Sequence, residues 1–272
     1  MRSAFALLLL LLAASAHAQD AAKPEDVAVG PVTLQIVETG SGEKELRHGT
    51  RVLLKESSVS AGRAAKFKDV DARVIEVGSG GNACGGWPAV VIVKDGKVAA
   101  DTTMKNECAA FAASADEEGF TFVERPQPGT DGSVWSFTSD DGMHRLGVLV
   151  FQPQPGTTWA DLTRMLDHPL ALFNVAPFDA AVRKLTGAQF RDFAQRLHVA
   201  SGVERKGNLL VGTGCQAHPC NSDQGFVGID RNGRAVFLAM RSNTRVTTWP
   251  ALARWPILLR GEYEAWRKAK SV

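Results

Sequence analysis

The sequence predicts an α+β protein in which an antiparallel β domain precedes a domain built from an antiparallel sheet flanked by helices. Short apolar or alternating runs, separated by turn residues, fill residues 32–153. Residues 152–156, which include two prolines and a glycine, interrupt this pattern. Runs with helical spacing then come before further strand-like runs, a mixture that is typical of α+β folds.

The first eighteen residues have the pattern of a secretory signal peptide. Arg2 supplies a positive charge, residues 4–14 are an unbroken apolar run, and small residues precede a cleavage site after Ala18. The apolar run is shorter than the ~20 residues that a membrane span needs. We therefore expect a periplasmic or secreted protein, with residues 19–31 as a polar leader.

Charge and cysteine content narrow the function classes. The chain has a formal net charge of +2, which gives no electrostatic case for nucleic-acid binding, and no later segment is apolar enough to cross a membrane. Its four cysteines, an even number in a secreted chain, predict two disulfides. Three pairings are open, and sequence neighbours favour Cys84–Cys108 and Cys215–Cys220. Loop closure would stabilise the fold by roughly 3 and 2 kcal/mol respectively.

The β domain, residues 32–153, is predicted from its runs and turns. We expect strands at residues 32–37, 51–54, 73–77, 89–93, 120–123, 134–137 and 146–151. Turn-forming residues fill the gaps, and Asp95-Gly96 between two apolar runs is a strong hairpin signal. Residues 116–118 are adjacent carboxylates, which we expect in a surface turn.

The second domain, residues 157–272, should begin with helices. Thr158 is a suitable cap for a helix over 159–166. Further helices are expected at 178–185 and 187–199, the latter with Phe190, Phe193, Ala194 and Leu197 on one face. Strands follow at 209–211, 225–229 and 235–240, with a turn at 230–233. The C-terminal stretch 249–270 is predicted to be a helix broken near Pro256.

The most unusual local feature is the sequence C-Q-A-H-P-C at residues 215–220. It lies between a strand ending near Gly212 and one beginning near Gly225. A disulfide across it would close a small, stiff loop that presents a histidine at little entropic cost. The candidate site residues are Cys215, Gln216, Ala217, His218, Pro219 and Cys220.

Three other interpretations of this loop compete. The bridge can simply be a hairpin staple with an incidental histidine. A metal site is disfavoured because structural zinc needs four ligands and only three donors cluster here. A catalytic base is disfavoured because no Gly-x-Ser-x-Gly, HExxH or Walker sequence is present. We therefore expect no metal, no cofactor and no enzymatic activity.

We expect structural roles or solvent exposure, rather than functional roles, for most aromatic and histidine residues outside the loop. Tryptophans more often pack in a core than serve as sugar platforms, and we expect this of Trp135, Trp159, Trp249, Trp255 and Trp266. His48 and His144 lie beside turns and are expected to be solvated.

The loop resembles that of the inhibitors of vertebrate lysozyme, the Ivy family, whose hallmark is a disulfide-closed C-K-P-H-D-C. The resemblance runs from about Asp179 to the C-terminus: a helix with Phe190 precedes the loop, the strand 209–212 leads into it, and Thr248-Trp249 follows. The family's Lys, Pro and Asp are replaced here by Gln216, Ala217 and Pro219. The β domain has no counterpart in the family.

The resemblance implies a periplasmic inhibitor of lysozyme or lysozyme-like murein hydrolases. Lysozyme cleaves between two carboxyl groups, and the resemblance implies that His218 would lie between them. A c-type lysozyme or a lytic transglycosylase would be the partner. The alternative is a non-inhibitory secreted envelope protein, a binding module that keeps only the Ivy-like fold. The sequence does not indicate an oligomeric state.

Overall fold

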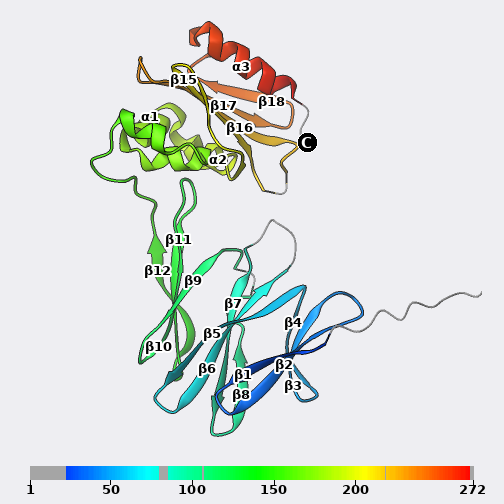
Figure 1. Ribbon diagram of the computed structural model, residues 1–272. Coiled ribbons are helices and arrows are strands. Elements are labelled where there is room, and N and C mark those ends of the chain that lie inside the picture. Colours follow the sequence, from blue (N-terminus) through cyan, green and yellow to red (C-terminus); the bar gives the residue numbers. More distant parts are fainter. Residues whose placement is uncertain (1–22, 80–84, 106, 218, 270–272) are drawn as a thin grey trace, which may run out of the picture.

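The computed structural model describes residues 23–79, 85–105, 107–217 and 219–269 (Figure 1). The predicted signal peptide lies outside these residues. The N-terminal part contains three four-stranded antiparallel sheets, and in each sheet the strands follow one another in chain order. The C-terminal part contains a fourth sheet with helices on both faces (Figure 1). The predicted fold class is therefore confirmed.

Each N-terminal sheet is a meander of consecutive hairpins. The first contains β1 (Glu25–Val29), β2 (Val32–Glu38), β3 (Lys44–His48) and β4 (Arg51–Glu56). The second contains β5 (Ser58–Phe67), β6 (Val70–Gly78), β7 (Trp87–Lys94) and β8 (Lys97–Asp101). The third contains β9 (Phe111–Ala115), β10 (Gly119–Glu124), β11 (Gly132–Thr138) and β12 (Gly142–Leu149).

The seven expected strands are present, although the last ends earlier than expected, at Leu149. The strands β1, β3, β5 and β9 were not expected from the sequence, whereas β8 is the second strand of the predicted Asp95-Gly96 hairpin. The prediction of a leader over 19–31 is wrong for residues 25–29, which form β1 and pair with β2. Val27 and Val29 alternate into the core at 1% exposure each, a pattern too short to stand out among polar neighbours.

The Asp95-Gly96 hairpin is confirmed. Lys94 pairs with Lys97 across it, and both turn residues have positive φ, 51° at Asp95 and 72° at Gly96. These angles match the two-residue turn whose twist suits antiparallel strands. The carboxylates at 116–118 are exposed in the turn between β9 and β10, as expected.

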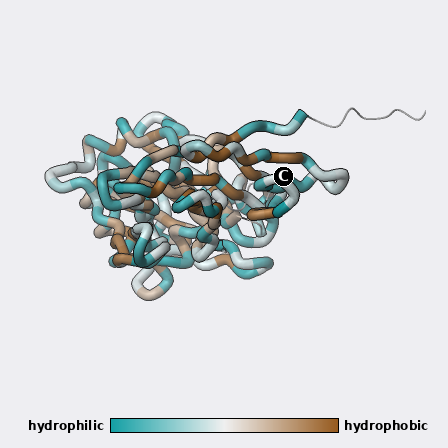
Figure 2. The backbone as a smooth tube through the Cα atoms, turned by 90° about the horizontal axis from the view of Figure 1, so that it is seen from below, coloured by the Kyte–Doolittle hydropathy of each residue, from teal (hydrophilic) through white to brown (hydrophobic). Residues whose placement is uncertain are grey.

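One hydrophobic core joins the three N-terminal sheets. It draws buried side chains from β1 to β12, and Phe67 of β5 meets Phe120 of β10 edge to face at 5.0 Å between ring centroids. Hydrophobic segments alternate with hydrophilic ones along the tube in Figure 2. Trp135 is in this core as expected, and His48 is exposed, but His144 is half-buried rather than solvated.

The C-terminal sheet is antiparallel, in the order β13-β15-β16-β17-β18, with β14 also paired to β15. Its strands are β13 (Val199–Ala200), β14 (Glu204–Lys206), β15 (Leu209–Cys215), β16 (Asp223–Asp230), β17 (Ala235–Ser242) and β18 (Arg245–Trp249). The helices are η1 (Trp159–Arg164), η2 (Pro169–Asn174), α1 (Ala176–Thr186), η3 (Gly187–Gln189), α2 (Phe190–Gln195), η4 (Leu252–Arg254) and α3 (Ile257–Lys268).

The predicted strands and α1 are confirmed, and the break near Pro256 separates η4 from α3. Three helix predictions need correction. The helix predicted over 249–270 begins only at Leu252, because Trp249 is the last residue of β18. The segment after Thr158 is a short 3₁₀ helix ending at Arg164. The helix predicted over 187–199 ends at Gln195, because Val199 pairs with β15 instead. Its apolar face is as predicted, since Phe190, Phe193, Ala194 and Leu197 are buried.

Successive side chains along the strands of the C-terminal sheet point to opposite faces and pack into two separate hydrophobic cores. Leu210, Val227 and Leu238 pack with α1 and α2 on one face. Leu209, Phe226 and Phe237 pack with α3 on the other, where Leu259, Tyr263 and Trp266 form its buried stripe. Burial on both faces explains why these strands are continuous apolar runs. Trp255 and Trp266 are buried here, and Trp159 and Trp249 pack against the first core, as expected.

Candidate functional site at the end of the β15–β16 hairpin

The cysteine loop closes the hairpin between β15 and β16. Cys215 and Cys220 form a disulfide with 4.8 Å between their Cα atoms, so the predicted Cys215–Cys220 bridge is present. Cys215 pairs with Gln224 in the ladder, and the Gln216 N–H donates to the Asp223 carbonyl at 2.9 Å. The loop is therefore an extension of the sheet with fixed ends.

Backbone hydrogen bonds fix the returning side of the loop. The Pro219 carbonyl accepts from the N–H groups of Ser222 and Asp223, both at 2.9 Å. The Gln224 Nε2 donates to the Cys220 carbonyl at 3.1 Å. Together with the disulfide, these bonds remove much of the conformational freedom that six residues would otherwise have, and preorganisation of this kind favours binding.

Arg196, just after α2, braces the base of the loop. Its Nη2 donates to Asp223 Oδ1 at 2.8 Å and to Ser242 Oγ at 2.7 Å. Its Nε donates to the Arg241 carbonyl at 3.1 Å, and its Nη1 to the Asp192 carbonyl at 2.7 Å. The Arg196 and Asp223 side chains are only 11% and 19% exposed. One guanidinium therefore joins α2, β16 and β17 beneath the loop.

A second brace comes from Arg241 of β17. Its Nη1 donates to Gln224 Oε1 at 2.8 Å, and its guanidinium lies 5.0 Å from the centroid of the Trp266 ring. Gln224 in turn holds the Cys220 carbonyl. Thus the loop is anchored to helices on both faces of the sheet.

Sequence reasoning missed these bracing residues. Arg196 and Asp223 are 27 positions apart, and no local pattern associates them. The only sequence signal is that polar residues flank the second cysteine, which is common in hairpin turns.

The predicted loop residues are close together, with one outside the described part of the chain. Gln216, Ala217, Pro219 and Cys220 are half-buried, and His218 lies outside the described residues. Cys84 also lies outside them, so the Cys84–Cys108 pairing stays a prediction. No cysteine in the described part is free.

A cavity of about 680 Å³ separates the loop from the N-terminal domain. Cys108, Phe111 and Thr130 are among its residues from the N-terminal domain, and His198, Val199 and Ala217 line it from the C-terminal domain. Two polar atoms on its walls, His198 Nε2 and Thr130 Oγ1, are buried without a hydrogen-bond partner among the described residues. Burial, and secondarily the charge of His168, lower the pKa of His198 below its ordinary value.

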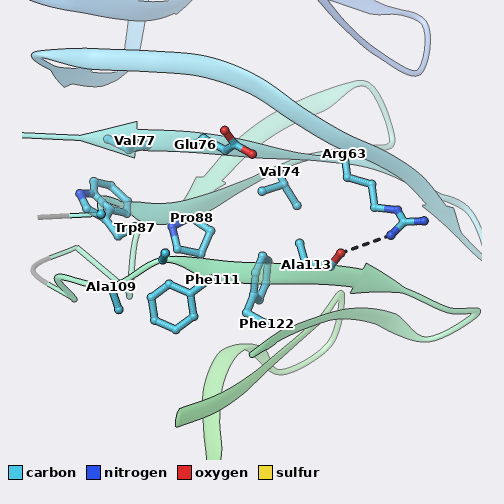
Figure 3. Close-up of a pocket in the computed structure, with 12 residues that line it drawn as sticks. Arg63, Val74, Glu76, Val77, Trp87, Pro88, Ala109, Phe111, Ala113 and Phe122 are labelled. Carbon is cyan, nitrogen blue, oxygen red and sulfur yellow. Dashed lines mark hydrogen bonds between the residues drawn. The ribbon is translucent and has the colours of Figure 1, made fainter. Parts of the chain in front are cut away.

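A second cavity, of about 380 Å³, lies within the N-terminal domain along β9 (Figure 3). Val74 and Trp87 line one wall and Phe111 the other. The Arg63 guanidinium reaches across and donates to the Ala113 carbonyl at 3.2 Å, drawn as a dashed line in Figure 3. Arg63 therefore occupies part of the outer edge of β9, where no strand of the described residues pairs.

Within the described ranges, no three His, Cys, Asp or Glu side chains are grouped closely enough to hold a metal ion. None of the helices in the same part of the chain has the length and apolar character of a membrane span.

Two different family models match the chain, one in its N-terminal part and one in its C-terminal part. Residues 31–150 match a family model described as the Y4bG N-terminal domain. Residues 177–269, which include the braced cysteine loop, match the model described as inhibitor of vertebrate lysozyme.

The C-terminal part of the chain is thus similar to the Ivy family over residues 177–269. The resemblance found from the loop sequence is thereby confirmed for this part of the chain. The Ivy match covers α1, α2, the sheet and α3, so it includes the loop and both of its braces.

Two individual proteins match larger parts of the chain than either family model does. The uncharacterized protein y4bG of Sinorhizobium fredii is 27% identical over 190 residues, covering 69% of this chain and 70% of that protein. A solved subtype N11 neuraminidase-like protein of A/flat-faced bat/Peru/033/2010 (H18N11) matches with a TM-score of 0.27 and 8% identity. That match covers 83% of this chain and 56% of the neuraminidase-like chain, so this chain spans little more than half of that protein's length.

Proposed function

We propose that this chain is a periplasmic or secreted inhibitor of lysozyme or lysozyme-like murein hydrolases. The observation that carries the proposal is the match of residues 177–269 to the Ivy family around a disulfide-closed, doubly braced hairpin end. In this proposal the chain is not an enzyme and requires no cofactor or metal. Secretion rests on the signal-peptide pattern of residues 1–18.

The mechanism is occlusion of the glycosidase cleft. Lysozyme uses two carboxyl groups on either side of the scissile bond. We assign the contact with them to His218, whose imidazole has two nitrogens and can donate to both carboxyl groups when protonated. Hydrogen bonds between ionised partners are stronger than neutral ones, so a protonated imidazole would bind this site well without any chemical step.

The departures from the family loop bear on potency. Pro219 stands where the family has an aspartate, so no carboxylate is next to His218 to hold or charge its ring. Gln216 replaces a lysine, which removes one positive charge that would face the acidic cleft. Both changes support weaker binding than a loop with the family sequence would give.

Cell-wall lysis is the direct test. Peptidoglycan-bearing cells are treated with a c-type lysozyme, and in a parallel arm with a lytic transglycosylase, over a titration of the mature protein. The expected result is slower lysis that saturates as the protein reaches the concentration of the enzyme. Unchanged lysis in both arms at saturating protein would overturn the proposal and favour a binding module that retains only the Ivy fold.

A further inference from the structure

The first turn of α3 carries the two most exposed large apolar side chains among the described residues. Ile257 is 79% exposed and Leu258 is 74% exposed. One turn further along the helix is Gly261, and no atom lies within 4 Å of the position that a Cβ would take there. Because helical side chains lean toward the N-terminus of their helix, a longer residue at 261 would cover Ile257. The glycine leaves Ile257 open to solvent.

The fold does not use this apolar pair. The helix packs on the sheet through Leu259, Tyr263 and Trp266, which are at most 8% exposed. Ile257 and Leu258 belong to neither core of the C-terminal domain. Single exposed apolar residues are common on protein surfaces, but two adjacent ones at the start of a helix form an apolar patch that no described part of the chain covers.

Uncompensated positive charge lies beside the patch. Residues 249–261 contain two arginines, Arg254 and Arg260, and no Asp or Glu. Both arginines are exposed, and neither forms an ion pair within the described part of the chain. The carboxylates further along α3, Glu262 and Glu264, each pair with a cation of this chain, at 2.6 and 2.9 Å. A partner that fits this surface must therefore be both apolar and anionic.

The patch lies where a large, flat partner can reach it. In Figure 1, α3 covers the face of the C-terminal sheet that is turned away from the N-terminal domain. Its first turns lie over the end of the sheet near the β16–β17 turn, because a Cβ on Gly228 would be 2.8 Å from the Leu259 side chain. Cys215 is at the opposite end of the same strands. Binding at α3 would therefore leave the cysteine loop free.

We propose that this face of α3 binds the surface of an anionic phospholipid bilayer. Ile257 and Leu258 enter the headgroup layer, and Arg254 and Arg260 contact lipid phosphates, which guanidinium groups bind well. Binding of an amphipathic helix at such an interface increases with the apolar area buried and with the attraction of its cations to anionic lipid. The inference goes beyond the proposed function and does not depend on it.

Other partners fit the same surface less well. In a pair of α3 helices from two copies of the chain, the arginines of one copy would approach those of the other, and like charges across an interface are unfavourable. A water-soluble acidic partner would attract Arg254 and Arg260 but would leave Ile257 and Leu258 in water. Only the lipid surface uses the apolar and the charged residues together.

Vesicle flotation tests the proposal with the purified protein and vesicles of equal parts phosphatidylglycerol and phosphatidylcholine. Wild type should float with these vesicles and much less with pure phosphatidylcholine. Arg254→Gln/Arg260→Gln should weaken partitioning roughly twenty-five-fold, because each cation near an anionic surface contributes about fivefold. Ile257→Thr/Leu258→Thr should weaken it by at least about tenfold, through the lost apolar burial.

Matched controls change equally exposed residue types elsewhere in the chain. Leu146→Thr/Val148→Thr replaces two exposed apolar residues of β12, at 59% and 54% exposure, and Arg145→Gln/Arg191→Gln replaces two exposed arginines. Both controls should partition like wild type. Circular dichroism melts establish that each variant is folded, and if the α3 threonine pair does not fold, the arginine pair decides the test.

Three results would overturn the proposal. The first is equal partitioning of either α3 variant and its control. The second is a loss confined to the arginine pair, which would show simple anion binding. The third is a wild-type dimer, measured by sedimentation without vesicles, that the α3 threonine pair dissociates, since a second copy would then cover the patch. No lysozyme enters these measurements, so their outcome is separate from that of the lysis test.

Discussion

Arg196 donates to the Asp223 carboxylate at 2.8 Å and thereby joins the end of α2 to the base of the cysteine loop. Both side chains are largely buried, and the remaining guanidinium bonds go to Ser242 Oγ and to backbone carbonyls. If Arg196 is replaced by an uncharged residue, the Asp223 carboxylate loses its cationic hydrogen-bond donor. It then keeps the neutral hydroxyl of Ser222, whose Oγ donates to it at 2.7 Å. The pair therefore contributes both to stability and to loop geometry.

We predict that Arg196→Met lowers the free energy of unfolding by about 2 kcal/mol, as expected for hydrogen bonds to a charged group. Urea unfolding measures this loss. Arg191→Met on the same helix is the control, because Arg191 is exposed and should change stability by less than about 0.5 kcal/mol. An equal loss of unfolding free energy in the two variants would show that the Arg196–Asp223 pair contributes no more to stability than an exposed arginine does.

We expect His218→Ala to weaken lysozyme inhibition by at least about 2 kcal/mol, roughly thirtyfold, as hot-spot residues do. His48→Ala, which changes an exposed histidine of the N-terminal domain, should leave inhibition unchanged. The measurement is the inhibition constant on one panel of lysozymes, with circular dichroism to establish that each variant is folded. Identical constants for His218→Ala and wild type would exclude His218 from the contact.

The double variant Cys215→Ser/Cys220→Ser should lower the free energy of unfolding by roughly 2 kcal/mol through the loop-closure entropy of six residues. Inhibition should weaken as well, because the loop must then be ordered at the moment of binding. Urea unfolding and the inhibition constant are measured on the same preparation. An unchanged inhibition constant would mean that the Arg196 and Gln224 braces alone order the loop.

Stability should depend on pH through His198. Its folded-state pKa lies below the ordinary 6.5, because of burial and the neighbouring His168. The unfolded chain then binds more protons than the folded one, so this contribution is complete above pH 6.5 and is lost as pH falls from there toward the folded pKa. His198→Gln should flatten the slope of unfolding free energy between about pH 7 and 5. An unchanged slope in His198→Gln would refute this assignment.

Limited proteolysis should cut first within residues 152–156, because separate cores lie on either side. A fragment of residues 157–272 should then unfold cooperatively by itself. Phe151 packs against the core of the second domain, although it precedes the predicted boundary. A fragment beginning at Phe151 should therefore melt at a higher temperature than one beginning at Thr157. Aggregation of both fragments would show that the two domains form one cooperative unit.

The local sequence pattern predicted the strands that have clear apolar runs, but it did not predict the strands that lack them. Runs such as 89–93 and 235–240 are apolar enough to predict strands, and Asp95-Gly96 specifies its own turn. The weaker strands β5 and β9 are rich in Ala and Ser, which carry no clear alternation. They are strands because neighbouring strands supply hydrogen-bond partners, and such nonlocal pairing leaves no mark in a short window.

The sequence by itself determined the fold class, the cysteine loop, its histidine and the resemblance to the Ivy family, since each depends on residues that are close together in the chain. Only the tertiary structure decided which distant residues hold that loop and which lie opposite it. The Arg196 brace spans 27 residues, and the cavity joins Ala217 to Cys108 and Phe111. These relationships depend on how distant elements pack, and packing is set by the shape of the whole core rather than by any local signal.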